Sequence, residues 1–124
     1  MTAAAAQSDA GAVVARRLDA YNARDIDAFM GTWHEDAQYF AHPSDLLASG
    51  AAAIRARHVI RFQDPILFGR LIGRFSVGGL VVDRGVVTRS FTEGRGRVDV
   101  IAIYEVDDGM IVCAWFKQGT PILD

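Results

Sequence analysis

The sequence predicts an α+β fold in which helices cover one face of an antiparallel sheet. Two observations lead to this fold class. Up to about residue 63, apolar residues recur at helical spacing. From Leu67 onward they alternate along several runs that are separated by turn residues. The chain has 124 residues, of which 51% are apolar, and this is enough for one well-packed domain.

The first predicted helix follows a start of the chain, residues 1–7, that we expect to be disordered or frayed. Ser8 or Asp9 is its cap, because both side chains accept hydrogen bonds from the free N–H groups at a helix start, and the helix reaches Asn22. Residues 8–124 are therefore expected to form a single domain. The apolar stripe of this helix has four residues at helical spacing: Ala10, Val14, Leu18 and Tyr21.

Two further helices are predicted, with a short strand at residues 37–40 between them. Asp25 caps the second helix, whose apolar residues share one helical face: Ile26, Phe29, Met30 and Trp33. Ser49 caps the third helix, which runs from Gly50 to about residue 63 because Pro65 prevents its continuation. The inward stripe of the third helix consists of Ile54, His58 and Phe62.

The predicted sheet follows from alternation and turn residues. Residues 67–77 alternate, Gly78-Gly79 suggests a bulge or bend, and Asp83-Arg84-Gly85 is predicted to be a tight turn between two strands. Residues 98–106 and 110–118 form the last two strands, which a turn joins. The sequence contains no internal repeat or linker that would divide this sheet between two domains.

Both faces of the last two strands are apolar at mid-strand. One face carries Val98, Val100, Ala102, Tyr104, Val112, Ala114 and Phe116, and the other carries Ile101, Ile103, Ile111, Cys113 and Trp115. Three helices can cover only one face, so the other would be exposed to water in a monomer. The sequence therefore predicts a homodimer that packs through the outer sheet face. The alternative is that the residues after Gln118 fold back over that face.

The composition argues against several classes of protein. The net charge of −2 gives no positive surface of the kind that binds nucleic acid, and no run approaches the roughly 20 apolar residues of a membrane span. Cys113 is the only cysteine and no signal peptide is evident, so we expect a cytoplasmic protein without a disulfide. The three histidines lack metal-ligand spacing and no phosphate-binding loop is present, so we expect neither a metal nor a cofactor.

Three stretches resemble the nuclear-transport-factor-2-like superfamily, which includes ketosteroid isomerases, SnoaL-like polyketide cyclases and limonene epoxide hydrolases. LDAYNARDIDAFMGTWHEDAQYF resembles the paired-helix opening, SGAAAIRARH the entry to the third helix, and RVDVIAIYEVDDGMIVCAWFKQG the final hairpin. The resemblance covers residues 10–119. It implies a cone-shaped, strongly curved antiparallel sheet wrapped around three N-terminal helices, with a pocket at the mouth of the cone.

The resemblance also indicates where a ketosteroid isomerase would hold its catalytic groups. Its tyrosine corresponds to Arg17 and its protonated acid to Ala102, while its base corresponds to Ala41, or to His42 if one residue is inserted. An alanine cannot move a proton, so the resemblance argues against steroid isomerisation by that mechanism.

Limonene epoxide hydrolases resemble this chain at one catalytic position only. Arg89 can stand for their arginine, whereas their two carboxylates correspond to Phe91 and to a position near Phe116. Without those acids, water activation and epoxide protonation have no proton carriers. The aspartate of SnoaL-like cyclases has no clear counterpart either.

The resemblance, combined with strand parity, implies which side chains line the cone. The strands contribute Val87, Arg89, Phe91, Val100, Ala102, Tyr104, Phe116 and Gln118, and the helices contribute Arg17, Tyr21, Phe29, Trp33, His58 and Phe62. An aromatic and aliphatic lining with a few polar groups is usual for a small-molecule site. The alternative is that these side chains meet and fill the cone as core.

Three polar residues are candidate functional groups. His42 ends a strand where relatives hold a catalytic acid, so its ring is either a proton carrier or part of a turn. Arg89 is expected at mid-strand on the inward face, where it needs an acid such as Glu93, Asp45 or one from a second subunit, or else an anionic ligand. His58 faces inward, either as a satisfied core residue or as an acid/base partner of His42.

The function that this pattern favours is binding of a small, mostly apolar molecule that carries an anionic or carbonyl group. The accompanying chemistry would be cofactor-free acid/base isomerisation, cyclisation or dehydration, with His42 as proton carrier and Arg89 stabilising an oxyanion. The alternative is a non-catalytic dimeric module for ligand binding or assembly, whose cone is filled by side chains.

Overall fold

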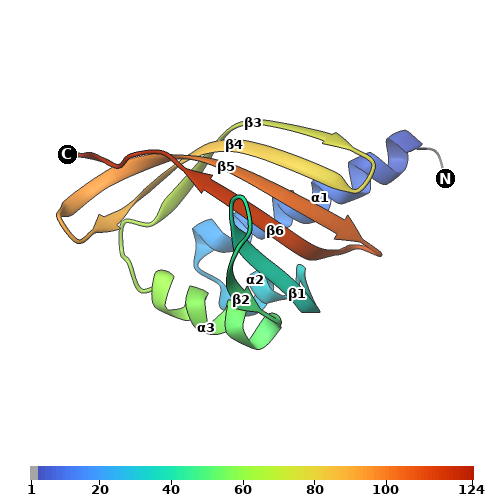
Figure 1. Cartoon of the computed structure of the whole chain (residues 1–124), viewed down its shortest axis with the longest axis horizontal. Coiled ribbons are helices and arrows are strands. Elements are labelled where there is room, and N and C mark those ends of the chain that lie inside the picture. Colours follow the sequence, from blue (N-terminus) through green and yellow to red (C-terminus); the bar gives the residue numbers. More distant parts are fainter. Residues whose placement is uncertain (1–2) are drawn as a thin grey trace.

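A computed structural model describes the backbone of residues 3–124 and the side chains of residues 9–124. The elements follow in the order α1 (Ala3–Ala23), α2 (Ile26–Met30), β1 (Trp33–Ala41), β2 (Asp45–Ser49), α3 (Ala51–Arg61), β3 (Phe68–Val77), β4 (Leu80–Phe91), β5 (Gly94–Asp107), β6 (Met110–Gln118) and β7 (Ile122–Leu123). Figure 1 shows the long strands β3 to β6 side by side, with α2 and α3 below them.

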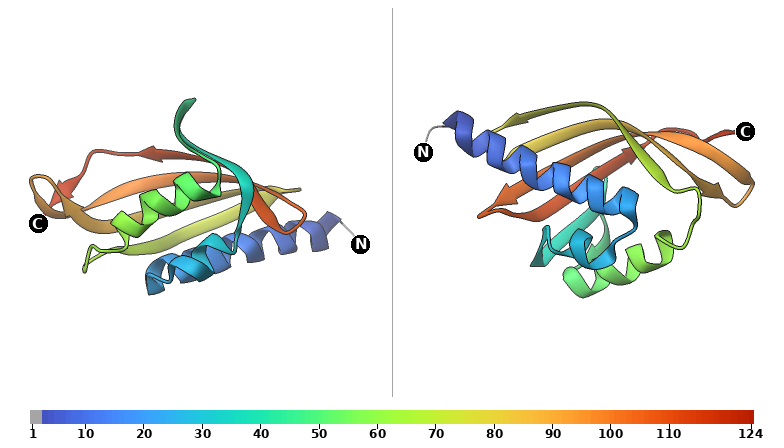
Figure 2. Two further views of the ribbon diagram at one scale, coloured as in Figure 1. Left: turned by 90° about the horizontal axis from the view of Figure 1, so that it is seen from below. Right: turned by 180° about the vertical axis from the view of Figure 1, so that it is seen from behind.

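The predicted fold class is confirmed: helices pack on one face of a large, curved sheet (Figure 2). The strand order is β2-β1-β6-β5-β4-β3, and β7 pairs with β5 beyond the end of β6. All neighbouring strands are antiparallel except β1 and β6, which are parallel, so the sheet is mixed rather than purely antiparallel. The parallel pairing of β1 with β6 joins the β1–β2 hairpin, which precedes α3, to the long strands that follow α3 in the chain.

Helix α1 begins at Ala3, earlier than the predicted cap at Ser8 or Asp9. Of the start that was expected to be frayed, Met1 and Thr2 lie outside the described residues. The predicted apolar stripe of α1 is confirmed, because Ala10, Val14 and Tyr21 are buried in the core and Leu18 is half-buried. This stripe directs one face of α1 toward the sheet, where the helix contacts β3, β4 and β5.

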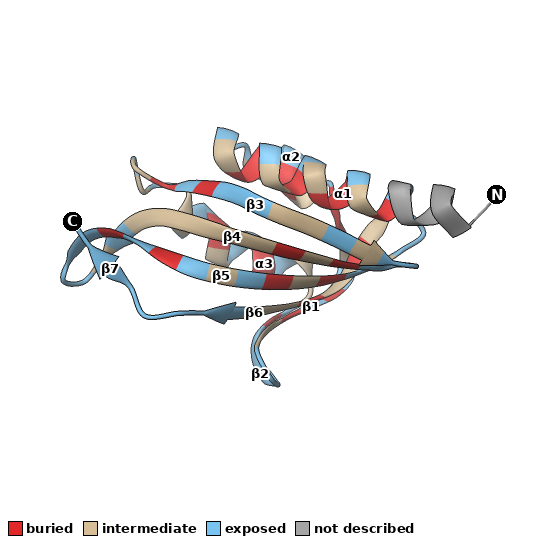
Figure 3. Ribbon diagram, turned by 90° about the horizontal axis from the view of Figure 1, so that it is seen from above, coloured by how far each residue is buried: buried red, intermediate tan, exposed pale blue. Residues whose placement is uncertain are grey.

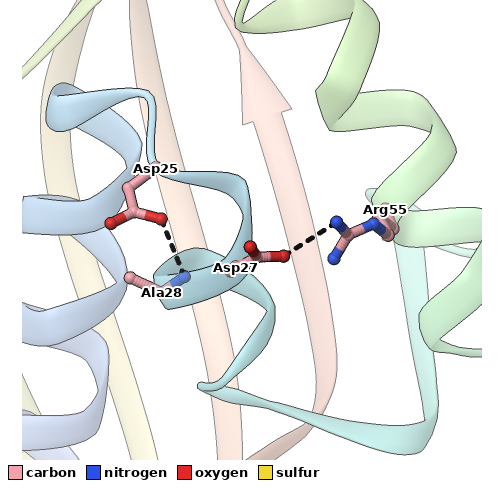
Figure 4. Close-up of polar contacts among 4 residues, drawn as sticks. All are labelled: Asp25, Asp27, Ala28 and Arg55. Carbon is pink, nitrogen blue, oxygen red and sulfur yellow. Dashed lines mark hydrogen bonds and ion pairs between the residues drawn. The ribbon is translucent and has the colours of Figure 1, made fainter.

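The start of α2 agrees with the prediction. Asp25 adopts an extended backbone, and its Oδ1 accepts a hydrogen bond of 3.1 Å from the backbone N–H of Ala28 (Figure 4). Asp27, in the first turn, forms an ion pair of 2.8 Å with Arg55 of α3. Both side chains are well exposed, so this pair orients the two helices and contributes little stability.

Helix α2 ends at Met30, and the prediction that Trp33 lies on the same helix is wrong. Trp33 is instead the first residue of β1. Its ring is still buried and lies 5.9 Å from that of Phe29, so the apolar side chain reaches the same core from a strand. Helical spacing cannot distinguish these two cases for a helix of little more than one turn.

Strand β2 was not predicted, and the assignment of Ser49 as a helix cap is wrong because Ser49 belongs to β2. The residue before α3 is Gly50, at φ 88° and ψ 157°, with no side-chain cap hydrogen bond. Only glycine adopts this backbone conformation without strain, and it is what turns the chain from the hairpin into the helix. Helix α3 buries Ile54 and His58 as predicted, and Phe62 follows its last turn.

The tight turn predicted at Asp83-Arg84-Gly85 is wrong, because β4 runs through these residues without a break. The β3–β4 hairpin turns instead at Gly78-Gly79, where Gly78 has a φ of 57°. A Cβ atom on Gly79 would collide with the carbonyl oxygen of Val106, so this close approach also requires glycine. Asp83 is tolerated inside a strand because Arg74, directly opposite on β3, neutralises it.

The core lies between the helices and the inner sheet face (Figure 3). Its largest fully buried side chains are Trp33, Tyr104, Phe29, Ile54, Leu67 and Ile111. Ile111 was expected on the outer face with Cys113 and Trp115, and this is wrong. The pairing of β5 with β6 shifts register between Glu105 and Val106, so Ile111 turns inward while the other two remain outside.

Candidate functional site

A cavity of about 100 Å³ lies between the helices and the inner face of the sheet. Helices α1 and α3 form one wall, and strands β3 to β6 form the other, with Tyr39 of β1 between them. Ten residues predicted to line the cone do so: Arg17, Tyr21, His58, Val87, Arg89, Val100, Ala102, Tyr104, Phe116 and Gln118. The cone is therefore not filled completely by its side chains.

Other residues predicted to line the cone do not reach the cavity. Trp33, Phe29 and Phe62 pack in an aromatic cluster beneath it, where the ring of Phe62 lies 5.3 Å from that of Phe29 and 5.5 Å from that of Tyr21. Phe91 lies at the far end of β4, where its ring packs under the guanidinium of Arg89. These side chains support the cavity wall but are not part of the lining.

Several lining residues were missed by sequence reasoning, and the most informative are Arg57 and Arg61 of α3. Each follows a residue of the inward stripe by three positions, Arg57 after Ile54 and Arg61 after His58. Helical spacing would have placed them at the margin of the stripe. Asp83 was missed because it was assigned to a turn.

His42 lies outside the inner cavity. It is exposed after the end of β1, where its backbone N–H donates to the carbonyl of Phe116 at 2.9 Å. Its side chain borders an adjoining hollow of about 300 Å³, together with Leu47 and Lys117. Four lining residues are common to the cavity and the hollow: Tyr39, Arg57, Phe116 and Gln118. The hollow is thus an outer annex of the same site.

Arg17 is buried among aromatic rings. Its guanidinium carbon lies 5.1 to 5.8 Å from the centroids of four rings, those of Tyr104, Tyr21, Phe29 and Phe116. Cation–π attraction stabilises the charge in this position. Its Nε is buried and has no hydrogen-bond partner in residues 9–124. Arg17 is therefore a buried cation without a protein acceptor at that nitrogen.

Arg89, on the sheet side of the cavity, also has a buried nitrogen atom without a hydrogen-bond partner in residues 9–124. This atom is Nε, and the guanidinium lies 4.4 Å from the ring centroid of Phe91. Burial, and then the nearby charge of Arg61, lower the pKa of the Arg89 guanidinium. Neither Glu93 nor Asp45, the acids considered from the sequence, forms an ion pair with it in the described part of the chain.

The balance of charge in the cavity is strongly positive. Five arginines line it, namely Arg17, Arg57, Arg61, Arg70 and Arg89, against the single carboxylate of Asp83. Arg74 binds that carboxylate through two hydrogen bonds of 2.7 and 2.9 Å, from its Nε and Nη2. The three ion pairs found in residues 9–124 include none of the five lining arginines. The cavity thus has an excess of cationic groups that form no close ion pair with the acids of this part of the chain.

His58 provides the one imidazole among the described residues that line the inner cavity. Its Nδ1 lies 2.8 Å from the carbonyl oxygen of Ile54, which can only accept, so Nδ1 carries the proton. Burial, reinforced by the charges of Arg17, Arg57 and Arg61, lowers the pKa of His58 to about 3, although the hydrogen bond to Ile54 opposes this shift. His58 is therefore a neutral imidazole at physiological pH.

Burial also raises the pKa of the Tyr21 and Tyr104 phenols, so both remain neutral. In the described residues no three His, Cys, Asp or Glu side chains come close enough together to hold a metal ion. The helices of the same part of the chain are too short or too polar to cross a bilayer. What the cavity can supply is a set of cations and neutral hydrogen-bonding groups on an apolar floor.

Comparison with known proteins gives a family and a fold. Residues 14–114 match the family model of the SnoaL-like domain. No curated protein matches the chain. A cystatin-fold protein of Novosphingobium aromaticivorans, described as uncharacterized, has 22% sequence identity and a TM-score of 0.78, with 85% of this chain and 94% of that chain covered.

Two further solved structures are similar. A candidate SnoaL-like polyketide cyclase of Jannaschia has 16% identity and a TM-score of 0.79, with 91% of this chain and 87% of that chain covered. An epoxide hydrolase of M. tuberculosis, described as like limonene epoxide hydrolase, has 17% identity and a TM-score of 0.76, with coverages of 91% and 84%. At these identities the similarity establishes the fold alone.

Proposed function

We propose that this chain, which belongs to the SnoaL-like domain family, binds a small anionic molecule in its internal cavity, between Arg17 and Arg89. The molecule has a mostly apolar body and a carboxylate or enolate-like oxygen. The observation that carries this proposal is that both arginines line the cavity and that each has a buried Nε atom without a partner in residues 9–124. A buried guanidinium without an acceptor is costly, and a ligand oxygen relieves that cost.

The size of the site limits the ligand. The inner cavity of about 100 Å³ is smaller than most ligand sites, which occupy roughly 300 to 1,000 Å³, whereas the adjoining hollow adds about 300 Å³. We therefore place the anionic group in the inner cavity and the rest of the molecule toward the hollow. In this arrangement His42, with Leu47, contacts the outer part of the ligand.

The reaction class that suits this site is cofactor-free acid/base chemistry, such as isomerisation, cyclisation or dehydration. A guanidinium such as that of Arg89 stabilises an oxyanion that develops on a carbonyl group. His42 is exposed at the edge of the hollow, and an imidazole is the commonest general acid or base, so it is the proton carrier of this proposal. Relatives named as a candidate polyketide cyclase and an epoxide hydrolase share the fold on which this chemistry would be carried out.

A second candidate function is ligand binding without catalysis. It is favoured because two positions of the cavity wall do not carry the catalytic residues of ketosteroid isomerases. These positions hold Arg17 and Ala102 in this chain. The two candidates differ in the fate of the ligand. A bound carbonyl acid that NMR recovers unchanged after prolonged incubation supports the binding protein, and a new product or solvent deuterium in the acid supports the enzyme.

Replacement of Arg89 by methionine tests the anion site. Phenylacetate and its neutral amide, phenylacetamide, have nearly the same shape, so calorimetry with both isolates the contribution of the charge. We expect the wild-type protein to bind the acid in preference to the amide. The Arg89→Met variant should lose about 10- to 100-fold in affinity for the acid, which is the usual size of a charge-assisted hydrogen bond.

Arg95→Met is the matched control, because Arg95 is an exposed arginine of the neighbouring strand that does not line the cavity. It should bind phenylacetate as the wild type does. Equal affinity of the wild-type protein for the acid and the amide would contradict an anion site, and so would an Arg89→Met variant that binds the acid undiminished.

We further propose that the outer sheet face joins two copies of the chain. Six apolar residues form one row across this face, each paired with the next on the neighbouring strand: Leu46, Phe40, Trp115, Ile103, Val82 and Phe75. Phe75 is 65% exposed and Leu46 is 53% exposed. The C-terminal strand β7 adds to the edge of β5 and so extends the sheet at Gly96 and Arg97.

Charges on both sides of this row favour a second copy as the occupant. Glu105 lies on one side of Ile103 along β5, and Lys117 lies on the other side of Trp115 along β6. A twofold axis parallel to the row would place each Glu105 over the side of the partner that holds Lys117. The same face is then complementary to itself in charge.

Light scattering at micromolar concentration should give twice the chain mass of 13.5 kDa. The Ile103→Glu variant places a charge in the middle of the row and should give the monomer mass with an unchanged far-ultraviolet spectrum. The control is Ile60→Glu, since Ile60 is 71% exposed on α3, away from the sheet. A wild-type monomer would refute the proposed dimer.

A further inference from the structure

The inner cavity holds one strong acceptor that the proposed anion site does not use, the Nε2 atom of His58. The other ring nitrogen, Nδ1, is committed to the carbonyl of Ile54 at 2.8 Å. The hydrogen bond of Nδ1 is the one found for this ring within residues 9–124, so Nε2 has no partner there. His58 is only 3% exposed and lines the cavity, so Nε2 is left available to a ligand in that space.

The surroundings of His58 fix the ring and give it no protein donor. Its ring packs at 4.5 Å from that of Phe29 and at 5.5 Å from that of Tyr39, with Phe62 at 5.9 Å. The charged and titratable groups around it are Arg17 and Tyr21 from α1, Tyr39 from β1, and Arg57 and Arg61 from α3. The arginines would repel a second positive charge, so the imidazole is held as a neutral acceptor.

We propose that the ligand of this cavity is a hydroxy acid or enol acid, whose O–H group donates to Nε2 of His58 while its anionic oxygen binds Arg17 and Arg89. This inference rests on the anion site proposed above and adds the chemical class of the ligand. An imidazole lone pair that faces a low-dielectric cavity among arginines discriminates sharply between ligands. A donor satisfies it, whereas a ligand without a donor leaves it unsatisfied.

The same geometry predicts that two acids of nearly equal size bind differently. Mandelate and phenylacetate differ by one hydroxyl group, which lies next to the carboxylate in mandelate. One enantiomer of mandelate should bind the wild-type protein about five- to tenfold more tightly than phenylacetate, as is usual for one buried hydrogen bond. The other enantiomer directs its hydroxyl elsewhere and should show no such gain.

The His58→Phe variant removes the acceptor and keeps an aromatic ring in the cluster. It should lose the preference for mandelate over phenylacetate, a ratio that is measured within the variant and does not depend on its overall affinity. If this variant does not fold, ¹⁵N NMR of the wild-type protein still decides the question. The Nε2 resonance of His58 should shift toward that of a hydrogen-bonded acceptor with mandelate, and it should not shift in this way with phenylacetate.

The possible outcomes distinguish a failure of the role proposed for His58 from a failure of the anion site on which that role rests. If neither acid binds, the anion site is refuted, and the ligand class with it. If both acids bind with the same affinity and the Nε2 resonance is unaffected, the anion site stands and the role of His58 is refuted. A preference for mandelate that persists in His58→Phe would assign the hydroxyl to another group and would also refute this role.

Discussion

The Arg17→Met variant is expected to be more stable than the wild-type protein and unable to bind phenylacetate with useful affinity. Arg17 is 7% exposed, and its Nε has no partner in the described residues. Cation–π contacts with four rings offset part of the desolvation of the charge. A buried, unpaired charge costs several kcal/mol, so we expect methionine to raise the free energy of unfolding by about 1 to 2 kcal/mol.

Thermal denaturation and calorimetry check the two halves of this expectation. A gain of that size should raise the Tm of a domain of this length by about 4 to 8 °C. Arg16→Met is the matched control, because the neighbouring Arg16 is exposed to solvent, and both the stability and the affinity of this variant should be unchanged. A loss of stability in Arg17→Met would show that the rings solvate the cation fully, and that Arg17 is a structural residue. A gain of stability with loss of binding would place this residue among those that proteins retain for function at the expense of stability.

The stability of the protein should fall steeply on acidification because of His58. The unfolded chain binds a proton at this histidine below its ordinary pKa of 6.5, whereas the folded protein does not bind one until the pH approaches about 3. The contribution of the neutral imidazole is thus fully present above pH 6.5 and is lost as the pH falls toward 3. The free energy of unfolding should decrease by about 1.4 kcal/mol for each pH unit across this window.

Comparison with His58→Phe isolates this contribution. Carboxylates also titrate in the acid range, and Asp64 is one of them. Burial raises the pKa of its carboxyl group, but hydrogen bonds from Ser90 and Ile66 outweigh this effect and lower the pKa. These groups are common to both proteins, so they cancel in the difference between the two denaturation series. Wild type and variant should diverge progressively below pH 6.5, with the wild type the less stable. Parallel curves would show that the imidazole is protonated in the folded protein and that the cavity is wetter than its burial indicates.

The sequence indicated much of the architecture because local signals agreed with one another. Asp25 is a helix cap in both the prediction and the structure, and the stripes of α1 and α3 are buried where helical spacing placed them. The predictions that were wrong share a cause. The assignments of Ser49, Trp33 and the Asp83-Arg84-Gly85 segment relied on local sequence signals, and each was decided by pairing with another strand.

The cavity could be predicted only in part. Strand parity placed Arg89, Ala102 and Phe116 on its wall, because side chains on a strand alternate strictly between the two faces. Parity cannot say how far a side chain reaches or whether a position lies above the core or within it. Trp33 and Phe62 were therefore assigned to the wall although they lie beneath it. His42 was placed at the mouth, although it borders the outer hollow.

By itself the sequence determined that helices precede most of the sheet, that they cover one sheet face, and that the last strands are apolar on both faces. These follow from periodicity, which is a property of neighbouring residues. Only the tertiary structure decided that five arginines converge on one cavity, that Arg74 takes the single carboxylate there, and that an imidazole faces the same space. These residues come from α1, α3 and the strands β3 and β4, far apart in the chain, and charge balance within a cavity depends on distances that no local pattern contains.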